Sequence, residues 1–151
     1  NKIELFTDGA CKGNPGLGGW GVLIINSKIL NELKGIQQQT TNNRMELIAV
    51  IKGLKSIQES ADIEITTDSM YVNNGINQWI DNWKNNGWKT AAKKPVKNKD
   101  LWQELDELVQ NYSIKWIWVK GHSGHPGNER ADQLANEAIE EFQNKNNTLT
   151  I

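Results

Sequence analysis

The sequence predicts a single α/β domain, and two observations support this prediction. Short runs of β-branched and apolar residues alternate with longer segments in which apolar residues recur at helical spacing. The length of 151 residues suits one compact core, and neither an internal repeat nor a second domain is visible. We therefore expect one sheet with helices packed against it.

Three β-compatible runs open the chain and are expected to pair as an antiparallel meander. They comprise residues 2–6, 20–25 and 29–36. The first run leads into Asp8-Gly9, a dipeptide that is common in turns. Asp8 is therefore either an ordinary turn residue or a carboxylate that the first strand presents at its end.

A glycine-rich segment separates the first two of these runs. Its residues Gly16, Gly18 and Gly21 match the G-x-G-x-x-G pattern of dinucleotide-binding proteins. That pattern binds pyrophosphate where a helix begins and presents its amide groups. Because a strand is expected at residues 20–25, the sequence argues against this type of site.

A helix is expected to begin near Asn43, where the apolar residues change to helical spacing. Its buried face would consist of Leu47, Ile48, Ile51 and Leu54. With Asn43 at the N-cap, Glu46 stands three residues later in an arrangement that resembles a capping box. A structural role for Glu46 therefore competes with a functional one.

Asp68 follows a short strand at residues 63–67 and opens the next helix. In that position it could serve only as an N-cap. It also stands at the carboxyl end of a strand, where open α/β sheets bind their ligands. The sequence leaves both roles open.

A tryptophan-rich helix is expected over residues 71–88, followed by a projecting loop over residues 89–99 that Pro95 interrupts. Residues 79–100 carry six lysines and two aspartates, a net charge of +4, which leaves 11 basic and 16 acidic residues elsewhere, a net charge of −5. Tryptophans at helical spacing usually belong to a core, and a charged loop is usually only solvated. However, nucleic-acid-binding surfaces also combine lysines, which contact phosphates, with aromatic faces, which pack on sugars or bases.

The last third of the chain continues the alternation of helices and strands. A helix, a strand, a flexible loop and a final helix are expected at residues 100–111, 114–119, 120–127 and 128–142. Asp100 would cap the first of these helices, and Asp132 lies one turn into the last, where an aspartate most often faces solvent. Residues 143–151 are asparagine-rich and are expected to form a disordered tail beyond a domain of residues 1–142.

Composition limits the expected cellular context. With 17 basic and 18 acidic residues, the whole-chain charge gives no sign of a polyanionic partner. A single cysteine, Cys11, cannot form an internal disulfide, and no apolar run reaches the length of a membrane span or a signal peptide. We therefore expect a cytoplasmic protein without a membrane association.

Several short motifs are spread along the chain from about residue 3 to residue 142. They are Thr7-Asp8-Gly9-Ala10, Gly13-Asn14-Pro15-Gly16, Thr41-Asn42-Asn43-Arg44-Met45-Glu46-Leu47, Thr67-Asp68-Ser69, Trp88-Lys89-Thr90, Trp118-Val119-Lys120-Gly121-His122 and Asn128-Glu129-Arg130-Ala131-Asp132. Any one motif is weak evidence, whereas their order and completeness are hard to obtain by chance. Together they resemble the type 1 ribonuclease H family in its single-domain bacterial form.

This resemblance implies a mixed five-stranded sheet, with strands one to three antiparallel, strands four and five parallel, and helices on both faces. It also implies endonucleolytic cleavage of the RNA strand of RNA/DNA hybrids with little sequence specificity, leaving 5′-phosphate and 3′-hydroxyl ends. The family's acidic residues correspond to Asp8, Glu46, Asp68 and Asp132. Such oxygen ligands suit two Mg²⁺ ions, with Mn²⁺ as a substitute.

The resemblance assigns His122 to a mobile loop, where it would assist proton transfer or product departure. An imidazole that titrates near neutrality suits either task. An ordinary surface histidine is the alternative. His122 and His125 could also suggest a zinc pair, yet no suitable cysteine accompanies them and magnesium accounts for more of the residues.

The resemblance further implies a surface that binds the hybrid across its minor groove, where 2′-hydroxyl groups distinguish RNA from DNA. The basic protrusion, defined as residues 88–99, would grip the DNA strand. The expected contacts are Asn14, Asn42 and Asn43 at the minor groove, Thr41 and Asn82 at a DNA phosphate, Trp79 on a deoxyribose, and Trp83, Lys84, Trp88, Lys89, Lys93 and Lys94 in or beside the basic protrusion.

Two features depart from the family pattern. Asn85 and Asn86 stand where relatives often carry basic residues, which predicts weaker hybrid binding with a shallower salt dependence. Met70 stands where some relatives place a glutamine that contacts the minor groove. That contact is therefore not expected in this chain.

Two other functional classes compete with a hybrid nuclease. A non-catalytic hybrid-binding module would be expected to lack some of the carboxylates, and all four are present. An integrase or a junction resolvase would share the clustered acids but not a tryptophan-rich basic protrusion. We therefore expect a monomeric nuclease that acts on RNA/DNA hybrids, and the sequence leaves open whether the tail binds a protein partner.

Overall fold

The computed structural model describes residues 2–58, 61–120 and 125–149. In this part of the chain, five strands form one sheet in the order β3-β2-β1-β4-β5. β1 to β3 are antiparallel neighbours, whereas β4 pairs in parallel with both β1 and β5, which confirms the mixed sheet expected from the resemblance. The strands are β1 (Lys2–Gly13), β2 (Gly16–Asn26), β3 (Ile29–Thr40), β4 (Asp62–Thr67) and β5 (Ser113–Trp118).

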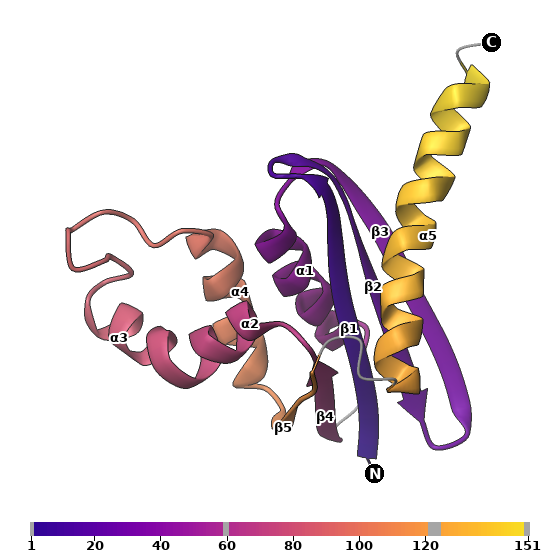
Figure 1. Cartoon of the computed structure of the whole chain (residues 1–151). Helices are drawn as coiled ribbons and strands as arrows, with labels where there is room; N and C mark the ends of the chain where they lie inside the picture. Colours follow the sequence, from indigo (N-terminus) through magenta and orange to yellow (C-terminus); the bar gives the residue numbers. More distant parts are fainter. Residues whose placement is uncertain (1, 59–60, 121–124, 150–151) are drawn as a thin grey trace.

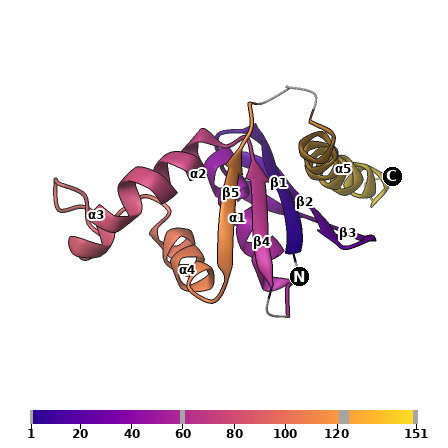
Figure 2. The same cartoon turned by 90° about the horizontal axis from the view of Figure 1, so that it is seen from below.

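Helices cover both faces of the sheet. α1 lies against one face beside α4, and α5 crosses the other face over β1, β2 and β3 (Figures 1 and 2). α2 and α3 extend away from the side of the sheet that carries β4 and β5 (Figure 2). The helical segments are α1 (Asn42–Lys55), α2 (Met70–Asn74), the π-helical η1 (Gly75–Trp79), α3 (Ile80–Asn85), α4 (Lys99–Val109) and α5 (Pro126–Leu149). None of those described is long and apolar enough to cross a membrane.

The side chains of β1 and β2 alternate between the two faces, as a strand requires. Leu5 belongs to the larger core cluster, which fills the space between the sheet and α1. Its neighbour Phe6 belongs to a smaller cluster with Leu23 and Ala131, on the face that α5 covers. The larger core cluster therefore lies on the face of the sheet that α1 covers, and the smaller one lies on the face that α5 covers.

Helix α1 begins one residue after Thr41, whose hydroxyl oxygen accepts a hydrogen bond of 3.2 Å from the Arg44 amide. Thr41 is therefore the N-cap, and the predicted capping box of Asn43 and Glu46 was wrong. Thr41, Asn42 and Asn43 are adjacent residues with good capping side chains, and the fold uses the first of them. Glu46 has no capping role and is available to the site described below.

Two aspartates that were considered as helix caps do not occupy the cap positions. Ser69 caps α2, since its hydroxyl oxygen accepts a hydrogen bond of 3.1 Å from the Val72 amide. Asn98 precedes α4 in a left-handed conformation with φ of 60°, so Asp100 lies in the first turn instead. Asp68 therefore lies at the carboxyl end of β4 and does not cap a helix.

The helical segments also differ in extent from the prediction. The expected helix over residues 71–88 is divided by η1 and ends at Asn85. At the other end of the chain, α5 continues to Leu149 instead of ending near Phe142, so residues 143–149 are helical rather than a disordered tail. No glycine or proline follows Gly127, and asparagines only weaken a helix without terminating it.

Candidate active site and nucleic-acid interface

Asp8 lies inside β1, which continues to Gly13, so the interpretation as a turn residue was wrong. It pairs with Gly21 of β2. On the other side, β4 pairs with β1 in parallel up to Phe6 opposite Thr66, which places Asp8 and Asp68 each two residues beyond the last pair. The parallel register therefore brings these two carboxylates to the same level of the sheet.

Gly9 allows the first turn of α1 to lie directly against β1. A Cβ atom at this position would lie 2.6 Å from the Glu46 backbone nitrogen, which is closer than real Cβ contacts. This contact brings Glu46 of α1 beside Asp8 of the sheet. Both are buried, with 6% and 5% of their surface exposed.

The four predicted carboxylates converge on one small cavity of about 200 Å³. Asp8, Glu46 and Asp68 each place one oxygen within 4.8 Å of the others. Asp132 reaches the same cavity from α5, so it does not face only solvent. This cavity, called the acidic pocket below, is lined by Asp8, Gly9, Glu46, Asp68, Asn128, Glu129 and Asp132.

The electrostatics of the acidic pocket follow from crowding like charges in a buried space. Burial first, and then the Asp68 and Asp132 carboxylates, raise the pKa of Asp8 to about 8. Burial, followed by Asp8 and Asp68, raises the pKa of Glu46 well above its usual range. A cation among these groups would favour their ionised forms, because it removes the cause of the repulsion.

Two buried oxygen atoms of the acidic pocket, Glu46 Oε2 and Asn128 Oδ1, have no hydrogen-bond partner among the described residues. Asn128 is 4% exposed and was not among the predicted site residues. It stands in the motif Asn128-Glu129-Arg130-Ala131-Asp132, but at the start of a helix, where asparagine is common, it was not assigned a role of its own. Buried acceptors beside three clustered carboxylates form an all-oxygen set, which fits a hard divalent cation such as Mg²⁺ or Mn²⁺.

The structure describes one of the two histidines that were considered for the site. His122 lies outside the described residues. His125 lies just before α5, where its Nδ1 accepts a hydrogen bond of 3.4 Å from the Asn128 amide and its ring packs against Phe6. These contacts show that His125 helps to start α5. Among the described residues, the group that could hold a metal ion contains no histidine.

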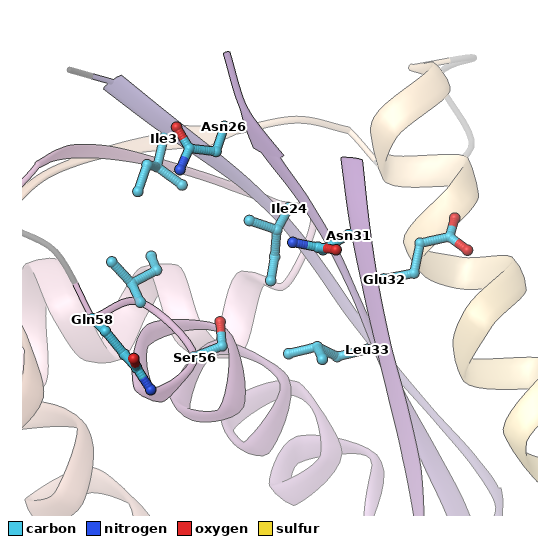
Figure 3. Close-up of a pocket in the computed structure, with 9 residues that line it drawn as sticks. Ile3, Ile24, Asn26, Asn31, Glu32, Leu33, Ser56 and Gln58 are labelled. Atoms are coloured by element: carbon cyan, nitrogen blue, oxygen red, sulfur yellow. The ribbon is translucent and has the colours of Figure 1, made fainter. Parts of the chain in front are cut away.

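A larger cavity, of about 430 Å³, lies near the start of β1 between the β2–β3 hairpin and the end of α1 (Figure 3). Its lining includes Ile3, Ile24 and Leu33, and it has one acidic residue, Glu32. The Glu32 carboxylate points toward α5, where it binds Arg130 (Figure 3). Size alone therefore does not identify the site, since of these two cavities the smaller one has the cluster of carboxylates.

The sequence profile of the RNase H family matches residues 1–140 of this chain. The chain belongs to the ribonuclease H family. Ribonuclease H of Pseudomonas putida strain F1 is 61% identical over 143 residues, which cover 95% of this chain and 97% of that protein. Ribonuclease H of Hydrogenovibrio crunogenus strain XCL-2 is also 61% identical, over 141 residues that cover 93% and 97%.

A solved structure supports the same assignment. LC9-RNase H1, described as a type 1 RNase H with the type 2 active-site motif, superposes with a TM-score of 0.84 at 32% identity. The match covers 93% of this chain and 72% of that one. The chain is therefore a bacterial type 1 ribonuclease H in both sequence and fold, as the sequence motifs implied.

The tryptophans of this ribonuclease H pack against one another and keep part of their surface exposed. Trp79 and Trp83 pack against each other with ring centroids 5.7 Å apart, and Trp83 also contacts the fully buried Trp102. Trp79, Trp83 and Trp88 are nevertheless only half-buried. They pack within the protein and leave part of each ring exposed near the basic protrusion.

The basic protrusion carries five lysines and no acidic residue. Val96, which is buried, anchors it, and its amide donates to the Trp88 carbonyl oxygen at 3.1 Å. Lys89, Lys93 and Lys94 are exposed, as expected for phosphate contacts. Lys84, in contrast, pairs with Asp106 of α4 at 3.3 Å.

The predicted minor-groove residues gather where the β1–β2 turn meets the start of α1. Gly16 pairs with Thr40, so the turn that contains Asn14 lies beside Asn42 and Asn43. All three asparagines are exposed, as is Asn82. Met70 also stands out, with 64% of its surface exposed near Asp68.

Arg44 connects this region to the base of the basic protrusion. Its guanidinium binds both carboxylate oxygens of Asp100, at 3.0 and 2.8 Å, and donates to Asn98 at 3.2 Å. The Asn98 amide in turn donates to the Tyr71 hydroxyl oxygen at 3.0 Å, which also accepts from the Trp102 indole at 2.9 Å. One hydrogen-bonded network therefore joins α1, α2 and α4.

Proposed function

We propose that this ribonuclease H cleaves the RNA strand of RNA/DNA hybrids endonucleolytically, leaving 5′-phosphate and 3′-hydroxyl ends. The observation that carries this proposal is the convergence of four carboxylates from β1, α1, the end of β4 and α5 on one cavity. A binding module would not need this arrangement, which raises the pKa values of Asp8 and Glu46. A bound cation would offset its cost in stability.

Asp8, Glu46, Asp68 and Asp132 would hold Mg²⁺, for which Mn²⁺ could substitute, and their oxygen-only donor set supports this choice over zinc. When bound, two such ions would supply an activated attacking water and charge stabilisation at the leaving 3′ oxygen. Asp8 and Glu46, whose pKa values are raised in the free protein, would release any proton they hold as they take up the metal.

The remaining residues would bind and orient the hybrid. Lys89, Lys93 and Lys94 would contact phosphates of the DNA strand, while Trp79 packs on a deoxyribose. Asn42 and Asn43, together with Asn14, would face the minor groove. Since contacts to phosphates and sugars carry no base information, cleavage would show little sequence preference.

The other proposed contacts are less direct. Thr41 and Asn82 would hold a DNA phosphate, although the Thr41 hydroxyl oxygen also caps α1. Trp83, Trp88 and Lys84 would support the basic protrusion more than they contact the hybrid, since they pack or pair within the protein. His122 would assist proton transfer or product departure from the segment before α5. We further propose that the enzyme acts as a monomer in the cytoplasm.

The proposal is tested by incubating the protein with three labelled duplexes, RNA/DNA hybrid, double-stranded RNA and double-stranded DNA, with Mg²⁺ or with EDTA. We expect cleavage of the RNA strand of the hybrid alone, and only with the metal. Product ends are checked by whether a kinase that phosphorylates 5′-hydroxyl groups can label them without prior phosphatase treatment. Cleavage of double-stranded DNA at a similar rate, or of hybrid in EDTA, would contradict the proposal.

A further inference from the structure

Asp132 differs from the other carboxylates of the acidic pocket in how it is held. The group of oxygens within 4.8 Å comprises Asp8, Glu46 and Asp68 but not Asp132. Asp132 is also less buried than Asp8 and Glu46, and it comes from a helix on the opposite face from α1. Repulsion from its neighbours would therefore favour rotation of its side chain toward solvent, unless another contact holds it.

The backbone of Asp132 is fixed by the close approach of α5 to β2. A Cβ atom at Gly21 would overlap the Ala131 carbonyl oxygen, and one at Gly19 would overlap that of Ala135. Ala131 and Ala135 are fully buried. Helix α5 therefore packs directly against Gly19 and Gly21 of β2, and this contact restricts movement of the Asp132 backbone.

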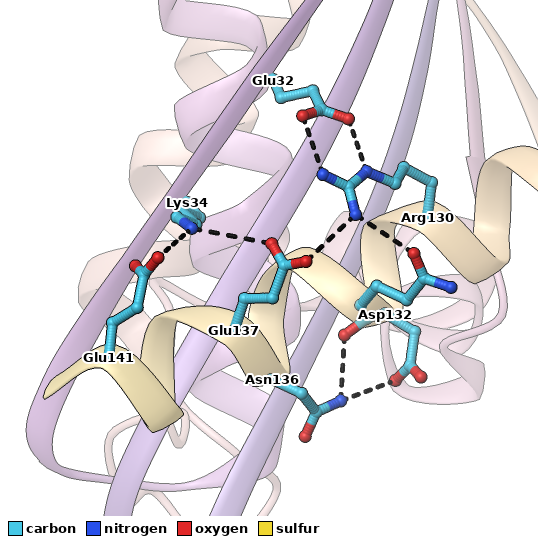
Figure 4. Close-up of polar contacts among 8 residues, drawn as sticks. Glu32, Lys34, Arg130, Asp132, Asn136, Glu137 and Glu141 are labelled. Atoms are coloured by element: carbon cyan, nitrogen blue, oxygen red, sulfur yellow. Dashed lines mark hydrogen bonds and ion pairs between the residues drawn. The ribbon is translucent and has the colours of Figure 1, made fainter. Parts of the chain in front are cut away.

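Charged side chains tie the same helix to β3 (Figure 4). Arg130 binds both carboxylate oxygens of Glu32, with Nη2 to Oε1 at 2.9 Å, and also contacts Glu137 at 3.2 Å. Further along the helix, Lys34 binds Glu141 at 2.9 Å. These contacts involve the side of α5 that faces β3 and do not include the Asp132 carboxylate.

The contact that holds the Asp132 side chain is made by Asn136, one turn further along α5 (Figure 4). The amide nitrogen of Asn136 lies 2.9 Å from the Asp132 carbonyl oxygen and 3.3 Å from its Oδ1. It therefore bridges the backbone and the carboxylate of one residue, which restricts the side-chain torsions of Asp132. In this position Asp132 lines the acidic pocket together with Asp8.

We propose that Asn136 is a positioning residue that holds the Asp132 carboxylate in the acidic pocket before the metal arrives. This inference rests on the proposed function, because it assigns Asp132 to the metal site. A neutral donor suits the task, since it offsets part of the negative charge of Asp132 without competing with the cation as a second positive charge would. Once the metal is bound, the same hydrogen bond keeps the carboxylate oriented, as partners of metal ligands commonly do.

The test measures the binding of Mn²⁺ or Mg²⁺ to the protein without substrate, by calorimetry, together with the melting temperature in EDTA. For Asn136→Ala we expect about tenfold weaker metal binding, at the low end of the 10- to 100-fold effect of removing a partner of a metal ligand, because the hydrogen bond to Oδ1 is long at 3.3 Å. Its melting temperature in EDTA should be unchanged or slightly higher, since alanine favours a helix. At saturating metal and hybrid, kcat should fall while KM for the hybrid stays the same.

Two further variants separate this role from a general effect on the helix. Gln143→Ala removes an exposed amide from the same helix away from Asp132 and should bind metal like the wild type. Asn136→Leu keeps a side chain of similar size without a donor, so it should bind metal as weakly as Asn136→Ala does. The inference is overturned if Asn136→Ala or Asn136→Leu binds metal with wild-type affinity, or if Gln143→Ala weakens metal binding as much as Asn136→Ala does.

The wild-type protein provides the reference that separates this inference from the proposed function. If the wild type fails to bind metal and to cleave hybrid, the proposed function is wrong. If the wild type does both and Asn136→Ala binds metal as tightly, only the role of Asn136 is wrong.

Discussion

The acidic pocket and the basic protrusion hold their charges in opposite ways. In the acidic pocket, Asp8 and Glu46 are buried and lie near other carboxylates, so their pKa values are raised. In the basic protrusion, Lys89, Lys93 and Lys94 project from a loop into solvent. One region concentrates charge within a packed framework, and the other displays it on an exposed loop.

This difference indicates what each region can contribute to function. Buried, crowded carboxylates store unfavourable energy that a cation releases, so they can bind a metal in a defined geometry. Exposed lysines gain affinity for phosphates mainly by releasing counterions, which requires little fixed geometry. The framework residues of the acidic pocket should therefore control turnover, and the lysines of the basic protrusion should control affinity and its salt dependence.

Replacing Asp8 by asparagine gives the largest expected effect. Activity on the hybrid should fall by more than about 100-fold, because removing a metal ligand costs more than removing one of its supporting partners, which costs about 10- to 100-fold. Above about pH 8, where Asp8 is ionised, the free energy of unfolding in EDTA should rise, since the substitution removes a buried charge. Single-turnover cleavage and urea unfolding measure the two effects. Asp62→Asn, at an exposed aspartate, is the control and should change neither.

The pH dependence of stability provides the second prediction. The pKa of Asp8 is about 8 in the folded protein, whereas the usual value is about 4, so the folded state binds more protons between these values. Stability in EDTA should therefore fall as pH rises from about 5 to about 8. Adding Mg²⁺ should remove much of this decrease, and metal affinity should weaken as pH falls below about 8. Urea unfolding with and without metal measures both trends, and a metal-free stability that rises over this range would contradict the account.

The lysines of the basic protrusion test the other side of the comparison. In a variant with Lys89, Lys93 and Lys94 changed to alanine, the slope of log affinity against log salt should become shallower by about 0.7–0.9 for each phosphate that the variant no longer neutralises. Metal affinity and kcat at saturating hybrid should be close to wild type. Filter binding over a series of salt concentrations measures the slope. The matched control is Lys28→Ala, in the β2–β3 turn, and an equal change in slope there would show that total charge alone matters.

Arg44 gives the smallest expected effect and sharpens the comparison, because it joins α1, the helix that carries Glu46, to Asn98 and Asp100 at the end of the basic protrusion. Arg44→Ala should lower the free energy of unfolding by about 0.5–1 kcal/mol, as expected for a partly exposed ion pair. KM for the hybrid should rise modestly, while metal affinity stays the same. A double-mutant cycle with Asp100→Ala isolates the pair, and Lys55→Ala, which breaks the exposed pair with Glu104, is the control for stability. A wild-type KM for the Arg44 variant would show that the network has no role in substrate binding.

Much of the fold was predictable from the sequence because its local patterns are strong. Alternating and β-branched runs located all five strands, and the segment after the glycines was correctly expected to be a strand. Strand ends were less predictable. β3 continues to Thr40 through the polar residues Gln37, Gln38 and Gln39, which an edge strand tolerates but a propensity argument does not favour.

Cap positions and helix ends were harder to predict for a physical reason. Thr41 and Asn43 are both good N-caps, and their difference in energy is small compared with the packing of α1 on the sheet. The same holds for Asn98 and Asp100 before α4. Tertiary contacts, which the sequence does not show directly, decide between neighbouring candidates.

The candidate site was predicted in part. The four carboxylates were named from motifs, and the structure brings them to one cavity, but no local pattern shows that Gly9 admits α1 or that β1 and β4 align Asp8 with Asp68. Asn128 and Asn136 were missed because each has the appearance of an ordinary helical asparagine in the sequence. Their importance follows from contacts made only in the folded chain.

The most direct test of the central claim is X-ray diffraction from crystals soaked in Mn²⁺, with anomalous scattering used to locate the ion. We predict anomalous density in the acidic pocket, among the carboxylates of Asp8, Glu46, Asp68 and Asp132. Density at other sites with none in the acidic pocket would show that these four residues do not form a metal centre.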